Sequence, residues 1–274
     1  MILTRRVALD GRQMDQIDER IAIQGIEFNG GRDTISAESL YGGTGSRVSN
    51  RHRDSLDITI RFGLMLERGR EAERARLLEA VNGWAAAGGW LTTNLKPDRR
   101  IRVSCASLPG DGEVMDWTKD YAIVLRAYGC PWWQEETGTS ASASGANATL
   151  QATLTINGYM TAPIDAEYRN TSGSAITSLT IGAGTSASAP ESRIQLESLG
   201  LASGETLVID HPDEGDRSWL RIRIRTASGV YRSAYSCRTP ESSDDLTASP
   251  GRKLVWVSGN GGGTLTANCR GRYW

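Results

Sequence analysis

The stretch SLDITIRFGLML, residues 55–66, carries the clearest structural signal in the sequence. Every second residue from Leu56 to Leu66 is apolar, without a break. Successive side chains of a strand point to opposite faces, so this pattern predicts a long β-strand with one buried face. Shorter apolar runs predict further strands in the same half of the chain, at residues 19–28, 100–107 and 121–128.

One helix is predicted beside these strands, within residues 67–90. Its glutamates and arginines lie three and four positions apart, which favours a helix. Apolar residues recur along one helical face at Ala72, Ala75, Leu78, Val81 and Trp84. The glycine pair that follows predicts the helix end. Strands, one helix and further strands together predict an α+β fold, mostly β, for the first part of the chain.

Two segments are expected to lack regular structure. Residues 41–54, YGGTGSRVSNRHRD, are rich in glycine and arginine and predict a long exposed loop. Residues 137–147, TGTSASASGAN, have the composition of a flexible linker. We therefore expect a first domain at residues 1–136, a linker at 137–147 and a second domain at 148–274.

The second domain is predicted to be a β-sandwich. Apolar residues alternate in short runs separated by glycine, serine, aspartate and proline, and no helical pattern interrupts them. Many short strands at regular spacing are typical of an all-β sandwich. The strands are expected at residues 150–156, 164–168, 207–210, 220–224, 254–257 and 265–269.

The bulk composition excludes several classes of function. The chain has 274 residues, 39% of them hydrophobic, and a net charge of −1. This composition supports a core, and it argues against a dedicated nucleic-acid binder, which normally carries a basic excess. No apolar run approaches the roughly 20 residues of a membrane helix, and the first nine residues lack a long apolar stretch, so we expect no signal peptide. We expect synthesis in the cytoplasm, no membrane insertion and no sequence-specific binding of nucleic acid.

No motif for catalysis, a cofactor or a metal is evident. The four cysteines form no CxxC pair, and His52 and His211 lack ligand spacing, so both are interpreted as loop histidines. The acidic run in residues 210–216 could supply oxygens to calcium, but it lacks EF-hand spacing and favours a solvated hairpin loop. The glycine runs at residues 42–45 and 259–263 match no phosphate loop. We expect a protein that is not an enzyme.

Two groups of residues are candidates for binding. In WLRIRIR, residues 219–225, Arg221, Arg223 and Arg225 share one face of a predicted strand. They could form a basic ridge for an acidic partner, although a solvated strand that protects a sheet edge is the favoured interpretation. Trp132 and Trp133 could contact a sugar or a partner, but such residues more often pack the rim of their own domain. The same preference for the core applies to Trp219 and Trp256.

Three stretches, taken in order, resemble the distal tail protein of long-tailed phages, the Dit-like siphovirus component that forms the baseplate hub. RHRDSLDITIRFGLML at residues 51–66 matches the arginine-flanked strand before the family's single helix. DYAIVLRAYGCPWW at 120–133 matches the last strand of the first domain, which runs into a proline and aromatic residues. LASGETLVIDHP at 201–212 is similar to a glycine-led hairpin of the second domain.

The resemblance implies a structural virion protein at the tail tip of a phage or prophage. Its α+β domain would close into a homo-hexameric ring, with a galectin-like β-sandwich outside the ring. The ring would join the tail tube protein to the baseplate, where the tail hub or tail-associated protein and the receptor-binding or fibre proteins are the implied partners. The ring interface is expected to include Leu56, Ile58, Ile60, Phe62, Trp132 and Trp133.

Two other classes of function remain as alternatives. A carbohydrate-binding protein acting in host-cell-surface adhesion would be a monomer with affinity for glycans. Host glycans are a candidate partner of any galectin-like fold, although a fold does not by itself carry a function. A hydrolase with an accessory β-sandwich would need convergent carboxylates or a nucleophile–base pair, and no motif for either is present. The lack of a secretion signal argues against both.

Overall fold

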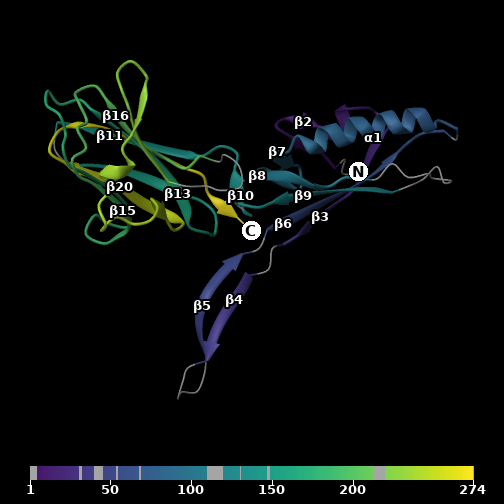
Figure 1. Ribbon diagram of the computed structural model, residues 1–274, viewed down its shortest axis with the longest axis horizontal. Helices are drawn as coiled ribbons and strands as arrows, with labels where there is room; N and C mark the ends of the chain where they lie inside the picture. The colour runs from purple at the N-terminus through teal and green to yellow at the C-terminus, as the bar shows by residue number, and fades with distance from the viewer. Residues whose placement is uncertain are drawn as a thin grey trace. The chain divides into compact units, whose positions relative to one another are not determined.

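The computed structural model describes residues 5–30, 33–39, 46–53, 55–67, 69–109, 120–129, 131–146, 149–212 and 220–273. The described chain falls into two units, the first ending at Trp133 and the second beginning at Gln134 (Figure 1). In this part of the chain, no helix is long and apolar enough to cross a membrane. The units confirm the predicted class, an α+β unit that is mostly β with one helix, followed by a β-sandwich.

The first unit is built on one antiparallel sheet with the strand order β2-β1-β7-β8-β9-β6-β3. A short 3-10 turn, η1 (Met14–Gln16), follows β2. The elements of this sheet and its helix are β1 (Val7–Leu9), β2 (Arg12–Gln13), β3 (Ile21–Asn29), β6 (Leu56–Leu64), α1 (Glu71–Ala86), β7 (Gly89–Thr93), β8 (Lys96–Ser107) and β9 (Tyr121–Ala127).

The predicted long strand is confirmed as β6, which lies between β3 and β9. Its alternate apolar side chains, from Leu56 to Leu64, are buried in the core of the unit. The predicted helix is confirmed as α1, and Trp84 on its buried face donates a hydrogen bond to the Arg12 carbonyl at 2.8 Å. Gly88 and Gly89 follow the helix with φ of +61° and +121°, values that favour glycine.

The expected loop at residues 41–54 is wrong for residues 46–53, which form strand β5 (Ser46–Arg53). This strand pairs with β4 (Asp33–Ser39) in a two-stranded sheet of its own. The pairing begins where the β3–β6 pair ends, so the hairpin continues that pair along the chain. The local sequence hid the strand because serine, arginine and asparagine have weak strand preferences, and the strand depends on its partner.

The second unit is a sandwich of two antiparallel sheets. One has the order β11-β21-β13-β16-β17-β18, with β19 also paired to β13, and the other has the order β12-β20-β14-β15. Their strands are β11 (Thr139–Gly145), β12 (Thr149–Ile156), β13 (Ala162–Asn170), β14 (Leu179–Gly184), β15 (Pro190–Leu196), β16 (Thr206–Asp210), β17 (Arg221–Arg225), β18 (Tyr231–Ser233), β19 (Thr247–Ala248), β20 (Gly251–Gly259) and β21 (Gly263–Cys269).

Both sheets of the second unit bury alternate residues in one continuous core. The six predicted strands correspond to β12, β13, β16, β17, β20 and β21, and they are confirmed. Outside the two sheets lie the 3-10 turn η2 (Tyr235–Cys237) and the pair formed by β10 (Trp133–Glu135) and β22 (Arg272–Tyr273).

The expected flexible linker is wrong for Thr139–Gly145, which forms strand β11. Each of its residues lies opposite a residue of β21, from Thr139 opposite Cys269 to Gly145 opposite Gly263. The low-complexity sequence still alternates: Ala141 and Ala143 pack against the core, while the serines between them are exposed. Small side chains resemble a linker in composition, yet period-two alternation is enough for a strand that has a partner.

Strands β14 and β15 carry no clear signal in the sequence, and glycine is part of the reason. A Cβ added at Gly182 in β14 would lie 2.4 Å from the ring of Trp256 in β20. The position therefore needs glycine so that the indole can lie across the neighbouring strand. Trp256 itself is 7% exposed, which confirms the core interpretation and removes it as a sugar platform. Trp219 lies outside the described residues.

Candidate functional site

The residues expected at a ring interface are mostly buried inside the first unit. Ile58, Ile60 and Phe62 have no exposed surface, and Leu56 is 5% exposed. The ring of Phe62 stacks on Tyr121 at 5.4 Å. These four residues form core contacts, so the expectation that they meet a neighbouring subunit is wrong. Alternation identifies the buried face of a strand, but it does not say whether the chain itself or another subunit covers that face.

The adjacent Trp132 and Trp133 differ in how far their side chains are buried. Trp133 is 1% exposed, and Phe28 meets it edge-on at 5.5 Å. The ammonium group of Lys96 lies 5.7 Å from both rings, and burial lowers its pKa. Trp133 is therefore part of the first unit's core and cannot reach a partner, whereas Trp132 is half-buried. The preference for packing within the domain is confirmed for Trp133.

Open surfaces of the first unit lie elsewhere. Strand β3 is an end strand of its sheet, and among the described strands only β6 pairs with it. It is nine residues long and carries half-buried Ile23, Ile26 and Phe28. The β4–β5 hairpin packs closely against no other helix or strand that the structure describes. Sequence reasoning could not find these surfaces, because a free edge depends on the strand order.

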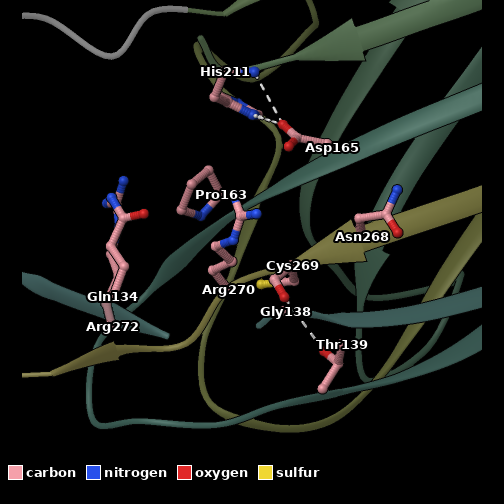
Figure 2. A pocket seen from close by; sticks show the side chains of 10 residues that line it. All are labelled: Gln134, Gly138, Thr139, Pro163, Asp165, His211, Asn268, Cys269, Arg270 and Arg272. Carbon is pink, nitrogen blue, oxygen red and sulfur yellow. Dashed lines mark hydrogen bonds and ion pairs between the residues drawn. The ribbon is translucent and has the colours of Figure 1, made fainter. Parts of the chain in front are cut away.

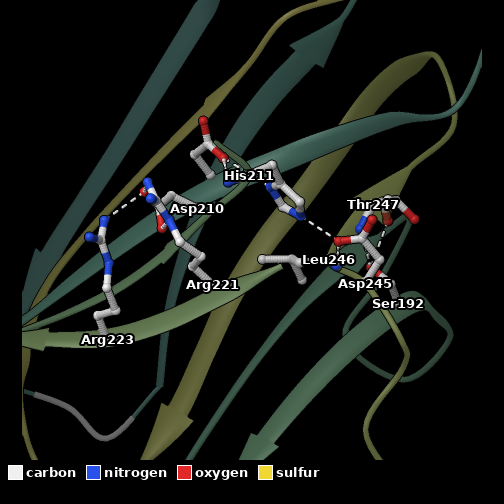
Figure 3. A network of polar contacts seen from close by, with 9 residues as sticks. Ser192, Asp210, His211, Arg221, Arg223, Asp245, Leu246 and Thr247 are labelled. Carbon is white, nitrogen blue, oxygen red and sulfur yellow. Dashed lines mark hydrogen bonds and ion pairs between the residues drawn. The ribbon is translucent and has the colours of Figure 1, made fainter. Parts of the chain in front are cut away.

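The arginines of β17 do share one face, but that face also carries acids from neighbouring strands. Arg221 and Arg223 each bond Asp210 of β16 at 2.8 Å (Figure 3). Arg225 bonds Glu167 of β13 at 2.8 Å. These pairs offset most of the positive charge, as expected of a solvated charged strand. The interaction of this ridge with an acidic partner stays a proposal.

A groove of about 360 Å³ lies beside these arginines, over β17 and the end strand β18. Its walls include Leu220, Ile222, Arg223, Tyr231, Arg232 and Tyr235. The Arg223 guanidinium lies 4.5 Å from the centre of the Tyr231 ring. Tyr231 and Tyr235 are each close to half exposed. Exposed tyrosine together with arginine is typical of the centres of protein interfaces.

The second unit contains a polar cluster that sequence reasoning missed. His211 follows β16, and its side chain is only 2% exposed. Its Nδ1 lies 2.9 Å from Asp165 of β13, and its Nε2 bonds Asp245, which precedes β19 (Figures 2 and 3). As interpreted, His211 lies in a loop, directly after β16, but it is buried and bonded to two carboxylates. The carboxylates lie 46 and 34 positions away in sequence, so no local pattern could reveal them.

The cluster holds its histidine in the charged form. Burial disfavours the charged imidazole, but the hydrogen bonds to Asp165 and Asp245 outweigh burial and raise the pKa of His211 to about 9. The bond to His211 in turn holds the pKa of Asp245 below its ordinary value, although burial opposes this shift. Both ring nitrogens already serve carboxylates, so neither is available to take a proton from a nucleophile.

A cavity of about 310 Å³ adjoins this histidine. Figure 2 shows His211 and Asp165 together in its wall, with Asn268, Cys269 and Arg270 also lining it. Burial raises the pKa of the Cys269 thiol to about 12, so a reactive thiolate is absent at neutral pH. In the described part of the chain, no three His, Cys, Asp or Glu residues could hold a metal ion. The side chain of His52 and residues 213–219 lie outside this part.

Comparison with known proteins yields matches only among solved structures. No protein-family model matches the chain, and no curated protein sequence matches it. The crystal structure of the Dit protein of phage SPP1, described as a paradigm of the hub adsorption apparatus in phages that infect Gram-positive bacteria, matches with a TM-score of 0.67 at 10% identity. The match covers 98% of this chain and 99% of that chain.

Two structures of the phage p2 baseplate in its activated conformation match more weakly. The strontium form has a TM-score of 0.50 at 8% identity and covers 97% of both chains. The calcium form has a TM-score of 0.50 at 9% identity and covers 98% of both chains. The chain therefore has, over nearly its whole length, a fold similar to that of the SPP1 Dit protein and of a chain in the p2 baseplate.

Proposed function

We propose that the chain is a structural protein of a phage or prophage tail tip, a distal tail protein whose ring joins the tail tube to the baseplate. The observation that carries this proposal is the match to the SPP1 hub protein across both units in one order. An α+β unit with a single helix, followed by a β-sandwich, is a specific combination. The match covers nearly the whole of both chains rather than one common domain.

The open surfaces of the first unit support self-association. A long end strand such as β3 presents unpaired backbone groups, and folded proteins normally cover such an edge. The β4–β5 hairpin forms a sheet of only two strands, and such hairpins are marginally stable in water without further packing. A neighbouring copy would cover both features through head-to-tail contacts, which close into a ring when the rotation between neighbours closes.

The ring is proposed to be a homo-hexamer. Its partners would be the tail tube protein on one side, and the tail hub and receptor-binding or fibre proteins on the other. The proposal assigns no catalytic role. The cluster with the best-placed histidine has both ring nitrogens engaged by carboxylates and no reactive thiolate beside it, which supports a structural role.

Particle mass and shape test this proposal. The full chain is measured by size-exclusion chromatography with light scattering, alone and with its tail tube protein, and then imaged by negative-stain electron microscopy. We expect particles of about six times the 29.7 kDa chain with a central hole. A monomer at every concentration, both alone and with the tube protein, would contradict the ring.

One observation favours carbohydrate binding as a second candidate, namely the exposed tyrosines of the β18 groove. Aromatic rings beside arginine could hold a sugar of the host surface. This candidate predicts a monomer that binds a glycan array, with binding lost in Tyr231→Ala. The ring hypothesis predicts instead that the unmodified chain and Tyr231→Ala both form rings, because the ring does not need Tyr231.

A further inference from the structure

Strand β15 ends the four-stranded sheet of the second unit, and an irregular segment covers its outer edge. The segment runs antiparallel to β15, and its backbone bonds alternate residues of the strand. The Glu197 amide donates to the Cys237 carbonyl at 2.8 Å, and the Gln195 and Arg193 carbonyls accept from Thr239 at 3.0 Å and Ser243 at 2.8 Å. This is the pairing that a further strand would make.

Two serines of the same segment complete this cover. The hydroxyl of Ser242 accepts the Gln195 amide at 2.9 Å, and the hydroxyl of Ser243 accepts the Arg193 amide at 2.9 Å. A serine hydroxyl can accept as well as donate, so it can stand in for a strand's backbone. The edge groups of Arg193, Gln195 and Glu197 are thus satisfied by a segment that is not itself a strand.

This cover is anchored at its ends rather than along its length. Thr239 and Leu246 are buried, whereas no side chain between them is, and most of those are polar. Segments with few buried apolar contacts open at low free energy, independently of the rest of a domain. At the far end, the Leu246 carbonyl accepts from the Ile164 amide at 2.9 Å, and the carboxylate of Asp245 bonds the ring of His211, which follows β16 of the opposite sheet (Figure 3).

Charged groups from several elements face this contact. Asp165 of β13 bonds the other ring nitrogen, and Arg272 of β22 acts on Asp245 from nearby. Cys269 and Arg270 line the adjoining cavity. Asp210, next to His211 in sequence, is engaged by Arg221 and Arg223 instead. The charged imidazole is thus held by two carboxylates, one on the sheet and one on the covering segment.

We propose that residues 237–245 form a releasable strap over the edge of β15, latched by His211 between Asp165 and Asp245, and that its release lets β15 pair with β15 of a second copy. The occupant follows from charge. If two copies of β15 pair antiparallel about Gln195, Arg193 of each lies opposite Glu197 of the other. Arg193 and Gln195 of β15 and Glu197, one position past its end, alternate on the more exposed face, so two cross-strand ion pairs would form.

The latch depends on pH with a defined sign. The pKa of His211 is raised to about 9, so the charged contact is complete below the ordinary value of 6.5 and is lost as pH rises through about 9. The pKa of Asp245 is lowered, so the contact is lost again only when acid protonates this carboxylate. The strap is therefore held most firmly in mildly acidic solution and opens in alkaline solution.

Hydrogen exchange of the full chain, read by mass spectrometry, tests the latch. Asp245→Asn removes a charged partner of His211. Asp244→Asn is the matched control, because Asp244 is fully exposed and its ion pair, with Arg238 at 3.3 Å, lies within the strap itself. We expect the amides of Arg193, Gln195 and Glu197 to exchange at least tenfold faster in Asp245→Asn and less than twofold faster in Asp244→Asn. Amides in the β14–β20 pairing should stay strongly protected in both.

A pH series on the unmodified chain needs no variant and provides an independent readout. After correction for intrinsic exchange, protection of the same three amides should be nearly lost by pH 10, while the β14–β20 amides stay strongly protected. Equal exchange in the two variants, or equal protection of the three amides and the β14–β20 amides at pH 10, would overturn the latch.

Sedimentation tests whether a second copy of the chain pairs with the uncovered edge of β15. We expect the mass of the Asp245→Asn species to double relative to the unmodified chain, whatever the starting assembly. Adding Arg193→Glu places like charges opposite Glu197 and should abolish the doubling while the fast exchange remains. Fast exchange without any doubling would overturn the pairing of two copies.

Discussion

Replacing Trp133 with alanine should unfold the first unit far more readily than the same change at its neighbour. A fully buried tryptophan removes about 200 Å² from water, which at about 25 cal/mol per Å² gives an upper value of about 5 kcal/mol. Core tryptophan-to-alanine changes generally cost about 3 to 5 kcal/mol. Trp133 is 1% exposed and also has an edge-on contact with Phe28, so we expect about 4 kcal/mol.

The matched control is Trp132→Ala, one position earlier in the chain. Trp132 is half-buried, so its loss should cost about 1 kcal/mol. Both variants remove one indole from the same segment, so effects on aggregation or on the unfolded chain should be similar. The difference between them isolates burial as the cause.

Hydrogen exchange resolves the effect by unit in the full chain. Peptides from β6 and β9 report on the first unit, and peptides from β13 and β21 report on the second. A loss of about 4 kcal/mol corresponds to about a thousandfold faster exchange through global opening of the first unit. Equal acceleration in Trp132→Ala and Trp133→Ala, or equal effects on both units, would refute the assignment of Trp133 to the core of the first unit.

Three further predictions follow from other contacts. Between pH 7.5 and 9.5 the second unit of the unmodified chain should lose about 2 kcal/mol more stability than that of His211→Asn, because the raised pKa of His211 stabilises the unit only while the imidazole is charged. Urea denaturation with pulse labelling of the buried Cys269 thiol measures this difference. Identical pH profiles of the two proteins would contradict it. Gly182→Val should cost about 3 kcal/mol in thermal unfolding through its clash with Trp256, whereas Gly173→Ala, whose Cβ meets nothing within 4 Å, should be neutral. Replacing residues 33–53, the β4–β5 hairpin, by a short glycine–serine linker should leave the first unit folded, because no described element packs closely on this hairpin. The same change should abolish rings in electron micrographs. Intact rings would show that the hairpin is not an assembly contact.

Local patterns predicted the features that depend on near neighbours in the chain. The alternation from Leu56 to Leu64 specifies a strand because period two needs only the backbone geometry of that stretch. Gly88 and Gly89 specify the end of α1 because left-handed backbone angles there favour glycine whatever lies around them. The sandwich followed from many short alternating runs, each readable by itself.

The pairing of strands that lie far apart in the sequence could not be predicted in the same way. The Ser/Ala segment at Thr139–Gly145 and the arginine-rich residues 46–53 have compositions typical of loops, and each is a strand because another segment lies beside it. The expected ring residues failed for a related reason: a strand's buried face is visible in its sequence, but the element that covers it is not.

The sequence by itself thus determined the class of fold, the single helix and the order of the two units, because periodicity and turn residues act over a few positions. Tertiary structure alone decided that Trp133 is buried while Trp132 is half-buried, that β3 is the end strand of its sheet among the described strands, and that His211 meets Asp165 and Asp245. Such contacts join residues tens of positions apart. Their energies depend on strand order and burial, which exist only after the whole chain has folded.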